Sequence, residues 1–290
     1  MFTDKTILVA GVTGTIGRAV TDALLARAPR AIRGLSRNAK DQFWMQRRYK
    51  GRQVRFILGS IEDRDRLLEM MDGVDYVINA AAYKHVGQCE YNPDAAESVN
   101  VGGLRNLLYA AGKCGVQKVL HVSTDKVARV SGVMAACKLL AEAIARTRWH
   151  WRDKPEVVCV RMGNILMSSG SLGEIIVECV KRGDPWPLTD ERMRRYFISQ
   201  KAAAEFILRA MEEGVSGEVW IPDMKEEFVV DVGVRIAEAA KVQYDRPAYD
   251  SAGYRLIGMQ PHENLQEALW GEEEAPQVET RDGAFVIARR

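Results

Sequence analysis

Short apolar runs recur along the first half of the chain, and amphipathic stretches separate them. The first run, residues 6–10, is hydrophobic at successive positions, as expected for a strand that is buried on both faces of a sheet. The stretches between the runs repeat apolar residues at helical spacing. This alternation predicts an α/β fold with a doubly wound parallel sheet and right-handed crossovers. The predicted strands are 6–10, 31–35, 54–58, 76–81, 119–123 and 157–161, and the predicted helices between them are 16–28, 63–71, 95–114 and 134–147.

The pattern becomes less regular in the second half. We predict that 1–165 forms the sheet domain and that 166–290 is mostly a smaller lobe, with some segments returning to the first domain. The acidic stretch that starts at Gly271 predicts a mobile tail. Helices are expected over 175–182, 201–213 and 229–242, with prolines breaking the segments between them.

Charge and hydropathy exclude two classes of partner. The 290 residues carry 41 Lys and Arg against 39 Asp and Glu, a net charge of +2, so no large basic field for nucleic acid is expected. Trp149-His150-Trp151-Arg152 predicts a helix end that packs against a neighbour rather than a stacking surface for bases. No apolar run approaches the roughly 18 residues of a membrane span, so no membrane partner is expected.

Cysteine and histidine usage indicates the compartment. The five cysteines are odd in number and form no C-x-x-C, and the four histidines form no H-x-x-x-H, so neither a disulfide framework nor a metal site is expected. The first residues lack the features of a secretory signal. These features predict a reduced, cytoplasmic protein.

A glycine-rich turn follows the first predicted strand directly and leads into a helix. Gly11-Val12-Thr13-Gly14-Thr15-Ile16-Gly17 has the spacing G-x-x-G-x-x-G. Glycines let the backbone approach a pyrophosphate, whose charge a helix N-terminus stabilises. In this strand–turn–helix setting the motif predicts a Rossmann-type dinucleotide site. Its cofactor-binding residues would be Gly11, Thr13, Gly14, Thr15, Ile16 and Gly17.

The cofactor is indicated by the end of the second strand, where an NAD-binding protein usually carries Asp or Glu. Leu35-Ser36-Arg37-Asn38-Ala39-Lys40 contains no acid. Ser36, Arg37 and Lys40 could instead surround a 2′-phosphate, which favours NADP over NAD. The alternative is that these residues form a solvated basic face.

Polar residues also follow the fifth predicted strand. Ser123-Thr124-Asp125-Lys126 stands where open α/β sheets bind ligands, at the carboxyl ends of the strands. Lys138 lies on the next predicted helix, and Met134 shares its face one turn earlier. A surface ion pair in a loop is the alternative reading of Asp125 and Lys126.

Together these motifs resemble the extended short-chain dehydrogenase/reductase superfamily. More narrowly, residues 5–270 resemble the inverting UDP-N-acetylglucosamine 4,6-dehydratases of flagellin-glycan and capsule polysaccharide synthesis. The pair Asp125-Lys126 is the most specific match, because related retaining dehydratases carry Asp-Glu. The other matching segments are Ala80-Ala81-Ala82-Tyr83-Lys84-His85-Val86, Glu90-Tyr91-Asn92-Pro93, Arg161-Met162-Gly163-Asn164, Ser168-Ser169-Gly170-Ser171, Leu188-Thr189-Asp190-Glu191-Arg192-Met193 and Pro261-His262-Glu263.

The resemblance implies an NADP-binding domain, a substrate-binding lobe and a reaction through a 4-keto sugar. In that reaction a base removes the C5 proton, the C6 hydroxyl leaves as water, and C5 is reprotonated from the opposite face. Lys126 fits the base, provided that burial and neighbouring cations depress its pKa. Asp125 fits the acid or the orienting group for the leaving hydroxyl, Thr124 can hydrogen-bond O4, and Lys138 would hold the nicotinamide ribose.

The chain departs from the superfamily at its catalytic Tyr-x-x-x-Lys, which reads Met134-Ala135-Ala136-Cys137-Lys138. A thioether cannot accept the proton of O4. Lys126 or a water relayed through Thr124 would have to serve, or oxidation at C4 is lost. Elsewhere Ser60 stands in place of an Asp that meets adenine, Ser169 and Gln260 replace arginines, and His262 replaces a glycine. Arg194, Arg195 and Lys181 remain as cations that could compensate.

The resemblance completes the predicted site and leaves its function open between three readings. The first is the NADP-dependent dehydratase acting on UDP-N-acetylglucosamine or a close relative; the second is a nucleotide-sugar epimerase or atypical dehydratase of secondary metabolism; the third is a non-catalytic NADP-binding sensor. The apolar face of 96–111 predicts a homo-oligomer or internal packing. Further cofactor contacts would come from Ser60, Ile61, Ala80, Ala81, Ala82, Lys84, Asn100 and Lys138, and substrate contacts from Lys84, His85, Asn164, Ser171, Thr189, Arg195, Gln260 and Glu263.

Overall fold

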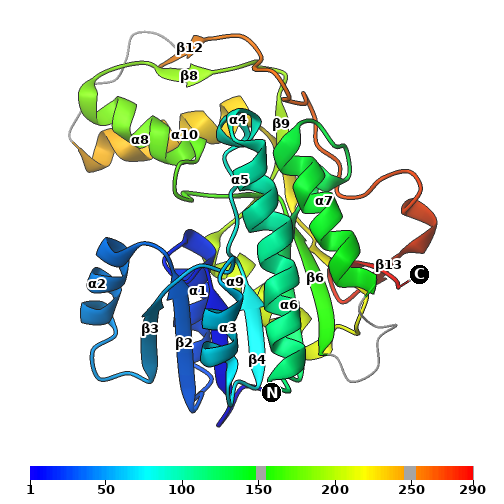
Figure 1. Cartoon of the computed structure of the whole chain (residues 1–290). Helices are drawn as coiled ribbons and strands as arrows, with labels where there is room; N and C mark the ends of the chain where they lie inside the picture. The colour runs from blue at the N-terminus through cyan, green and yellow to red at the C-terminus, as the bar shows by residue number, and fades with distance from the viewer. Residues whose placement is uncertain (148–154, 245–252, 290) are drawn as a thin grey trace.

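A computed structural model describes residues 1–147, 155–244 and 253–289 and shows a nine-stranded sheet flanked by helices (Figure 1). The strand order is β13-β14-β10-β6-β5-β4-β1-β2-β3. The expected doubly wound α/β sheet is confirmed. Residues 149–152, for which a helix end was predicted, lie outside the described residues. The strands are β1 (Thr6–Ala10), β2 (Ala31–Ser36), β3 (Val54–Leu58), β4 (Tyr76–Asn79), β5 (Lys118–Thr124), β6 (Glu156–Met162), β10 (Val219–Pro222), β13 (Val278–Arg281) and β14 (Ala284–Ile287).

The seven strands from β3 to β10 pair in parallel, and their central members are buried along their whole length. Burial on both faces explains why these strands appear in the sequence as continuous apolar runs.

The C-terminal segment corrects one expectation. It was predicted to be a mobile tail, but β14 pairs antiparallel with β10, and β13 pairs antiparallel with β14. Ala284, Val286 and Ile287 are fully buried in the main core. The segment therefore extends the sheet, because its apolar residues outweigh the acidic run before it.

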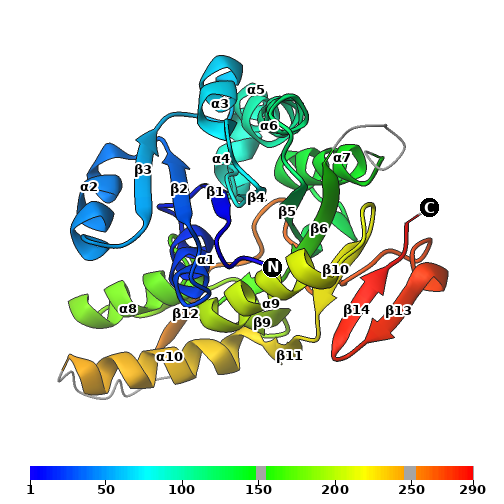
Figure 2. The same cartoon turned by 90° about the horizontal axis from the view of Figure 1, so that it is seen from below.

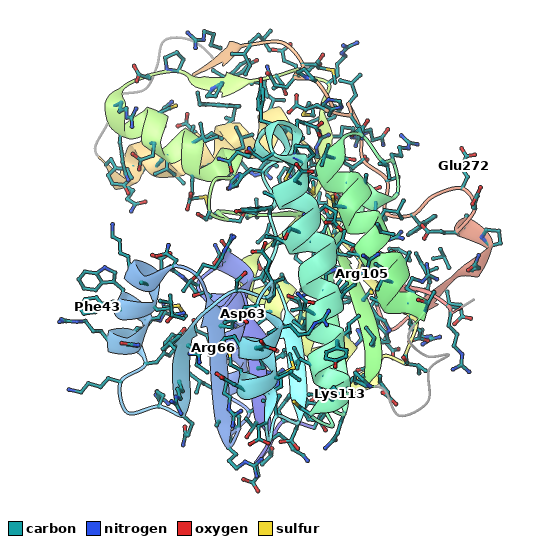
Figure 3. All side chains as sticks on the ribbon, in the orientation of Figure 1. Phe43, Asp63, Arg66, Arg105, Lys113 and Glu272 are labelled. Carbon is teal, nitrogen blue, oxygen red and sulfur yellow. The ribbon has the colours of Figure 1, made fainter. Side chains whose placement is uncertain are left out.

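Helices cover both faces of the sheet (Figure 2). On one face lie α1 (Thr15–Leu25) and α9 (Gln200–Glu213); on the other lie α3 (Arg64–Met71), α6 (Gly103–Lys113) and α7 (Val133–Arg146). Side chains define several starts: Asn38 caps α2 (Ala39–Arg48), Asp63 caps α3 (Figure 3), and Ser199 caps α9.

The helix predicted over 95–114 is interrupted. The structure has α5 (Pro93–Glu97), a π-helical turn over Ser98–Gly102, and then α6. A short helix, α4 (Val86–Tyr91), precedes them. The wider turn matters for the site, because it contains Asn100.

A second, smaller core lies in the C-terminal half. It contains Ile176 and Val180 of α8 (Leu172–Arg182), Ala237 and Ala240 of α10 (Val229–Gln243), and the fully buried Trp186. This lobe also holds the short sheets formed by β7 (Asn164–Ile165), β9 (Arg194–Ile198) and β11 (Lys225–Phe228), and by β8 (Trp186–Leu188) and β12 (Tyr254–Leu256).

Arg161 fixes the C-terminal segment to the sheet domain. This buried guanidinium donates to both carboxylate oxygens of Glu142 on α7, at 2.6 to 3.2 Å, and to both of Glu274, at 2.6 and 2.7 Å. Breaking a buried pair leaves a charge without its partner, which is strongly destabilising.

We therefore expect Glu274→Gln to lower the free energy of unfolding by about 3 kcal/mol. The matched control is Glu273→Gln, because Glu273 is exposed and its carboxylate takes no part in this cluster. Urea unfolding of both variants measures the difference. Equal stability of the two variants would show that the Arg161 cluster does not anchor the segment.

Candidate active site

A cleft of about 740 Å³ opens at the carboxyl ends of the parallel strands. It lies where the strand order reverses between β1 and β4, the point at which doubly wound sheets bind ligands. Residues that follow β1, β2, β3, β4, β5 and β6 all line it, together with α7 and the segment between β7 and α8.

The glycine turn brings backbone unusually close to backbone. Gly11 has a φ of +81°, and a Cβ there would lie 2.7 Å from the Ala81 nitrogen. A Cβ on Gly17 would lie 2.2 Å from the Gly11 carbonyl oxygen. Helix α1 begins at this turn with no side-chain cap and no acid in its first turn. The turn thus fits a pyrophosphate, because Gly11 and residues 13–17 line the cleft at the positive N-terminal end of the helix.

The end of the cleft formed by the segments after β2 and β3 is polar without being acidic. Ser36 and Arg37 line it, and so do Ser60 and Ile61 from the segment after β3. The Ser36 hydroxyl accepts a hydrogen bond from Gln42 at 2.9 Å, and the Arg37 guanidinium stacks 4.7 Å from the ring centre of Tyr83. Among the described residues that line the cleft, none is Asp or Glu. Lys40 lies outside the lining and is exposed.

The wall formed by β5 and α7 carries most of the predicted catalytic residues. Thr124, Lys126, Met134 and Lys138 all line the cleft. Asp125 is fully buried behind this wall, where its Oδ1 accepts from Thr124 Oγ1 and from Lys126 Nζ, each at 3.1 Å. Its Oδ2 is buried and has no hydrogen-bond partner among the described residues. Asp125 therefore acts on the cleft through the two side chains that it contacts.

The environment of Lys126 differs from the one that we expected for a catalytic base. Burial and neighbouring cations were expected, but the side chain is 24% exposed and its Nζ lies 3.1 Å from Asp125 and 3.6 Å from Glu267. Lys126 thus pairs with two carboxylates rather than with cations. They hold the amine in place at the edge of the cleft.

Lys138 is buried, and its Nζ donates to the Val122 carbonyl oxygen at 2.7 Å. Burial lowers the pKa of Lys138 to about 8, against an ordinary 10.5. Met134 lies one helical turn earlier and is also buried. The charge of Lys138 is therefore sensitive to pH near 8.

This lowered pKa gives a stability prediction with a definite sign. Between pH 8 and about 10.5 the amine is neutral in the folded state and charged in the unfolded state, so unfolding takes up a proton. The folded state therefore gains stability as pH rises through that window. Below pH 8, burial of the charge costs on the order of 3 kcal/mol. We expect Lys138→Met to be more stable than the wild type at about pH 7 and equally stable above about pH 10.5. Urea unfolding at both pH values tests this. A variant that is less stable at neutral pH would contradict it.

A segment from the lobe crosses the cleft near the glycine turn. The Ser169 nitrogen donates to Thr15 Oγ1 at 2.9 Å, and Lys84 Nζ donates to the Ser169 carbonyl oxygen. Burial lowers the pKa of Lys84, and burial together with Lys84 lowers the pKa of His85. Lys84, His85, Asn164 and Ser171 all line the cleft, as do Ala80, Ala81 and Ala82.

Several predicted contacts lie elsewhere. Asn100 braces the chain after β4 by accepting from the Tyr83 nitrogen at 2.8 Å and donating to its carbonyl at 3.0 Å, but does not line the cleft. Thr189, Gln260 and Glu263 also lie outside the lining. Arg195 is buried and donates to the carbonyls of Asn264 and Leu265, at 2.7 and 3.2 Å. Its guanidinium is thus engaged with backbone.

Sequence reasoning missed two residues of the site. Tyr83 lines the cleft and stacks with Arg37, and Glu267 meets Lys126 from the far end of the chain. No local spacing could have shown the second contact, because the fold alone brings the two residues together. Within the described ranges no helix is long and apolar enough to cross a membrane, and no group of three or more His, Cys, Asp or Glu could hold a metal ion.

Comparisons with known proteins agree on the family. Residues 7–289 match the sequence model of a protein family that is described as polysaccharide biosynthesis protein. An X-ray structure of Pen from Bacillus thuringiensis superimposes with a TM-score of 0.93 at 30% identity, covering 99% of this chain and 88% of that one.

Three curated relatives differ in the function that their names give. An uncharacterized membrane protein of Methanocaldococcus jannaschii is 36% identical over 99% of this chain and 86% of its own length. The inverting UDP-N-acetylglucosamine 4,6-dehydratase of Campylobacter jejuni is 30% identical, covering 93% of this chain and 78% of the relative. The UDP-glucose 4-epimerase of Rickettsia felis is 30% identical, covering 99% and 84%.

Proposed function

Because the chain belongs to the polysaccharide biosynthesis protein family of extended short-chain dehydrogenases, with nucleotide-sugar dehydratases and epimerases as homologues, we propose that it is an NADP-dependent 4,6-dehydratase. Its substrate would be UDP-N-acetylglucosamine or a close relative, with inversion at C5. The observation that carries this proposal is the pair Asp125 and Lys126 at the end of β5, with the amine on the cleft wall and the carboxylate behind it. An amine placed there can exchange a proton with the sugar carbon.

The cofactor would lie along the glycine turn, with its pyrophosphate at the start of α1 and its adenosine end between Ser36, Arg37 and Ser60. When bound, NADP supplies reversible hydride exchange with the sugar. The cleft supports NADP rather than NAD because its described lining offers a guanidinium and hydroxyls at that end, and no carboxylate for a ribose. Lys138 would hold the nicotinamide ribose.

The residues of the β5 wall would manage the protons of the sugar. Lys126 Nζ takes the C5 proton and passes it to the C6 hydroxyl, which leaves as water. Hydride would then add at C6, and a proton from solvent would add at C5 from the opposite face. Asp125 orients this step, since its Oδ1 contacts both Lys126 Nζ and Thr124 Oγ1. With Met134 unable to accept a proton, we assign the O4 proton to a water relayed through Thr124, because Lys126 has to be neutral to take the C5 proton.

Product analysis tests the proposal. Purified protein is incubated with UDP-N-acetylglucosamine and either NADP or NAD, and the sugar nucleotide is analysed by mass spectrometry. The expected result is a product that has lost one water, formed faster with NADP. An unchanged sugar nucleotide, with NADP bound, would refute the proposed reaction.

A nucleotide-sugar epimerase is the second candidate. It is favoured by the likeness to the Rickettsia enzyme and by Ser169 and Gln260, where the inverting dehydratases carry arginines. An epimerase would give a product of unchanged mass whose C4 configuration differs by proton NMR. That outcome would replace the dehydratase proposal.

A further inference from the structure

Glu267 is a buried carboxylate of the C-terminal half that reaches Lys126, on the wall formed by β5 and α7. It is 5% exposed, and its Oε1 lies 3.6 Å from Lys126 Nζ and 3.8 Å from Arg195 Nε. Its Oε2 accepts from Asn264 Nδ2 at 3.3 Å. Burial of a carboxylate is costly unless cations and donors surround it, so the position of Glu267 is defined by these partners.

The segment that carries Glu267 is fixed along β9 of the lobe. Arg194 donates its backbone N–H to the Leu265 carbonyl at 2.8 Å, and Arg194 forms a parallel bridge with Gln266. Arg195 adds donors to the carbonyls of Asn264 and Leu265. The same arginine therefore holds both the backbone of the segment and the carboxylate that the segment presents.

Lys126 depends on this arrangement because a lysine side chain has many rotamers. One carboxylate beside it, Asp125, precedes it in the chain and comes from the same turn; a single partner fixes a distance but leaves the amine free to swing. Glu267 approaches from a different element. Two carboxylates from two elements define one place for the Nζ atom.

We propose that Glu267 is a positioning residue for the reaction. It holds Lys126 against the cleft and links the lobe to the wall formed by β5 and α7. This inference rests on the proposed function of Lys126 as the C5 base. Arg195 acts one step further out, because it holds Glu267.

The test compares the pH dependence of kcat for the wild type and Glu267→Gln, with UDP-N-acetylglucosamine and NADP. The groups that face Lys126 are Asp125 and Glu267, with Arg195 behind the latter. Removing the charge of Glu267 favours the neutral amine, so the limb on which activity rises with pH should move to lower pH by at least about half a unit. The plateau kcat should fall about 10-fold or more, because the amine is no longer held, while KM changes little.

Glu226→Gln is the matched control. Glu226 supports the same segment, accepting from Gln266 at 2.7 Å and pairing with Arg194 at 3.4 Å, whereas Lys126 pairs with Asp125 and Glu267. It should keep the wild-type pH limb. If Glu267→Gln does not fold, Glu267→Asp serves instead, because it keeps a negative charge in the buried cluster and draws the carboxylate back from Lys126; its plateau kcat should fall with KM little changed.

The outcomes separate two failures. An inactive wild type would refute the proposed function, on which the inference depends. If the wild type is active, three results would refute the positioning role alone. Glu267→Gln could keep full activity, its profile could be lowered without a shift of the limb, or Glu226→Gln could shift the limb equally. A lowered profile without a shift would mean only that less of the protein is folded.

Discussion

Replacing Lys126 by methionine is expected to lower kcat for UDP-N-acetylglucosamine by about 10³-fold, because general base catalysis contributes about 10²–10⁴-fold. Methionine keeps the length of the side chain and removes the amine that lies between Asp125 and Glu267. NADP affinity should change less than about two-fold, since the glycine turn follows β1 and is not part of this wall. Steady-state kinetics and NADP titration measure the two quantities.

The control for this variant is Lys113→Met, at the end of α6 on the outer surface (Figure 3). It removes the same charge far from the cleft and should leave kcat unchanged. If Lys126→Met kept wild-type turnover, Lys126 could not be the base, and the wall of β5 would have to be reinterpreted.

Gly17→Ala is expected to raise the Kd for NADP by about 100-fold. A Cβ at this position would lie 2.2 Å from the Gly11 carbonyl oxygen and 2.6 Å from the Val12 Cα, both backbone atoms. The turn must therefore move, and the N–H groups that face a pyrophosphate move with it. Equilibrium titration with NADP measures the loss.

Gly87→Ala gives a matched change without a clash. A Cβ on Gly87, in α4, would meet no heavy atom within 4 Å. This variant should bind NADP as the wild type does. Equal affinities of the two variants would place the cofactor away from the glycine turn.

The middle of the sheet was predictable because β1 and β4 are buried along their whole length, which leaves an apolar run in the sequence at each of them. The C-terminal strands were not. Glu272-Glu273-Glu274 indicated a solvated tail, but Glu274 pairs with Arg161, and β14 pairs with β10. Neither partner is close in sequence, and so no local pattern carries either contact.

The site divides in the same way. The glycine turn and residues 123–126 were found because each motif is a single segment whose chemistry depends on its own spacing. Arg195 was expected at the substrate, but it holds the backbone of the segment that presents Glu267. Its role could not be predicted, because a strand of one sheet and a distant loop define it together. The π turn that places Asn100 likewise depends on packing rather than on helical periodicity.

Incubation in heavy water tests the central claim most directly. The protein is mixed with NADP and UDP-N-acetylglucosamine in deuterium oxide, and C5 of the sugar is read by proton NMR beside the mass of the product. The account predicts a product that has lost one water and has gained one deuterium at C5. Lys126→Met should show neither change. A dehydrated product with hydrogen retained at C5, or deuterium at C5 in Lys126→Met at the wild-type rate, would contradict it.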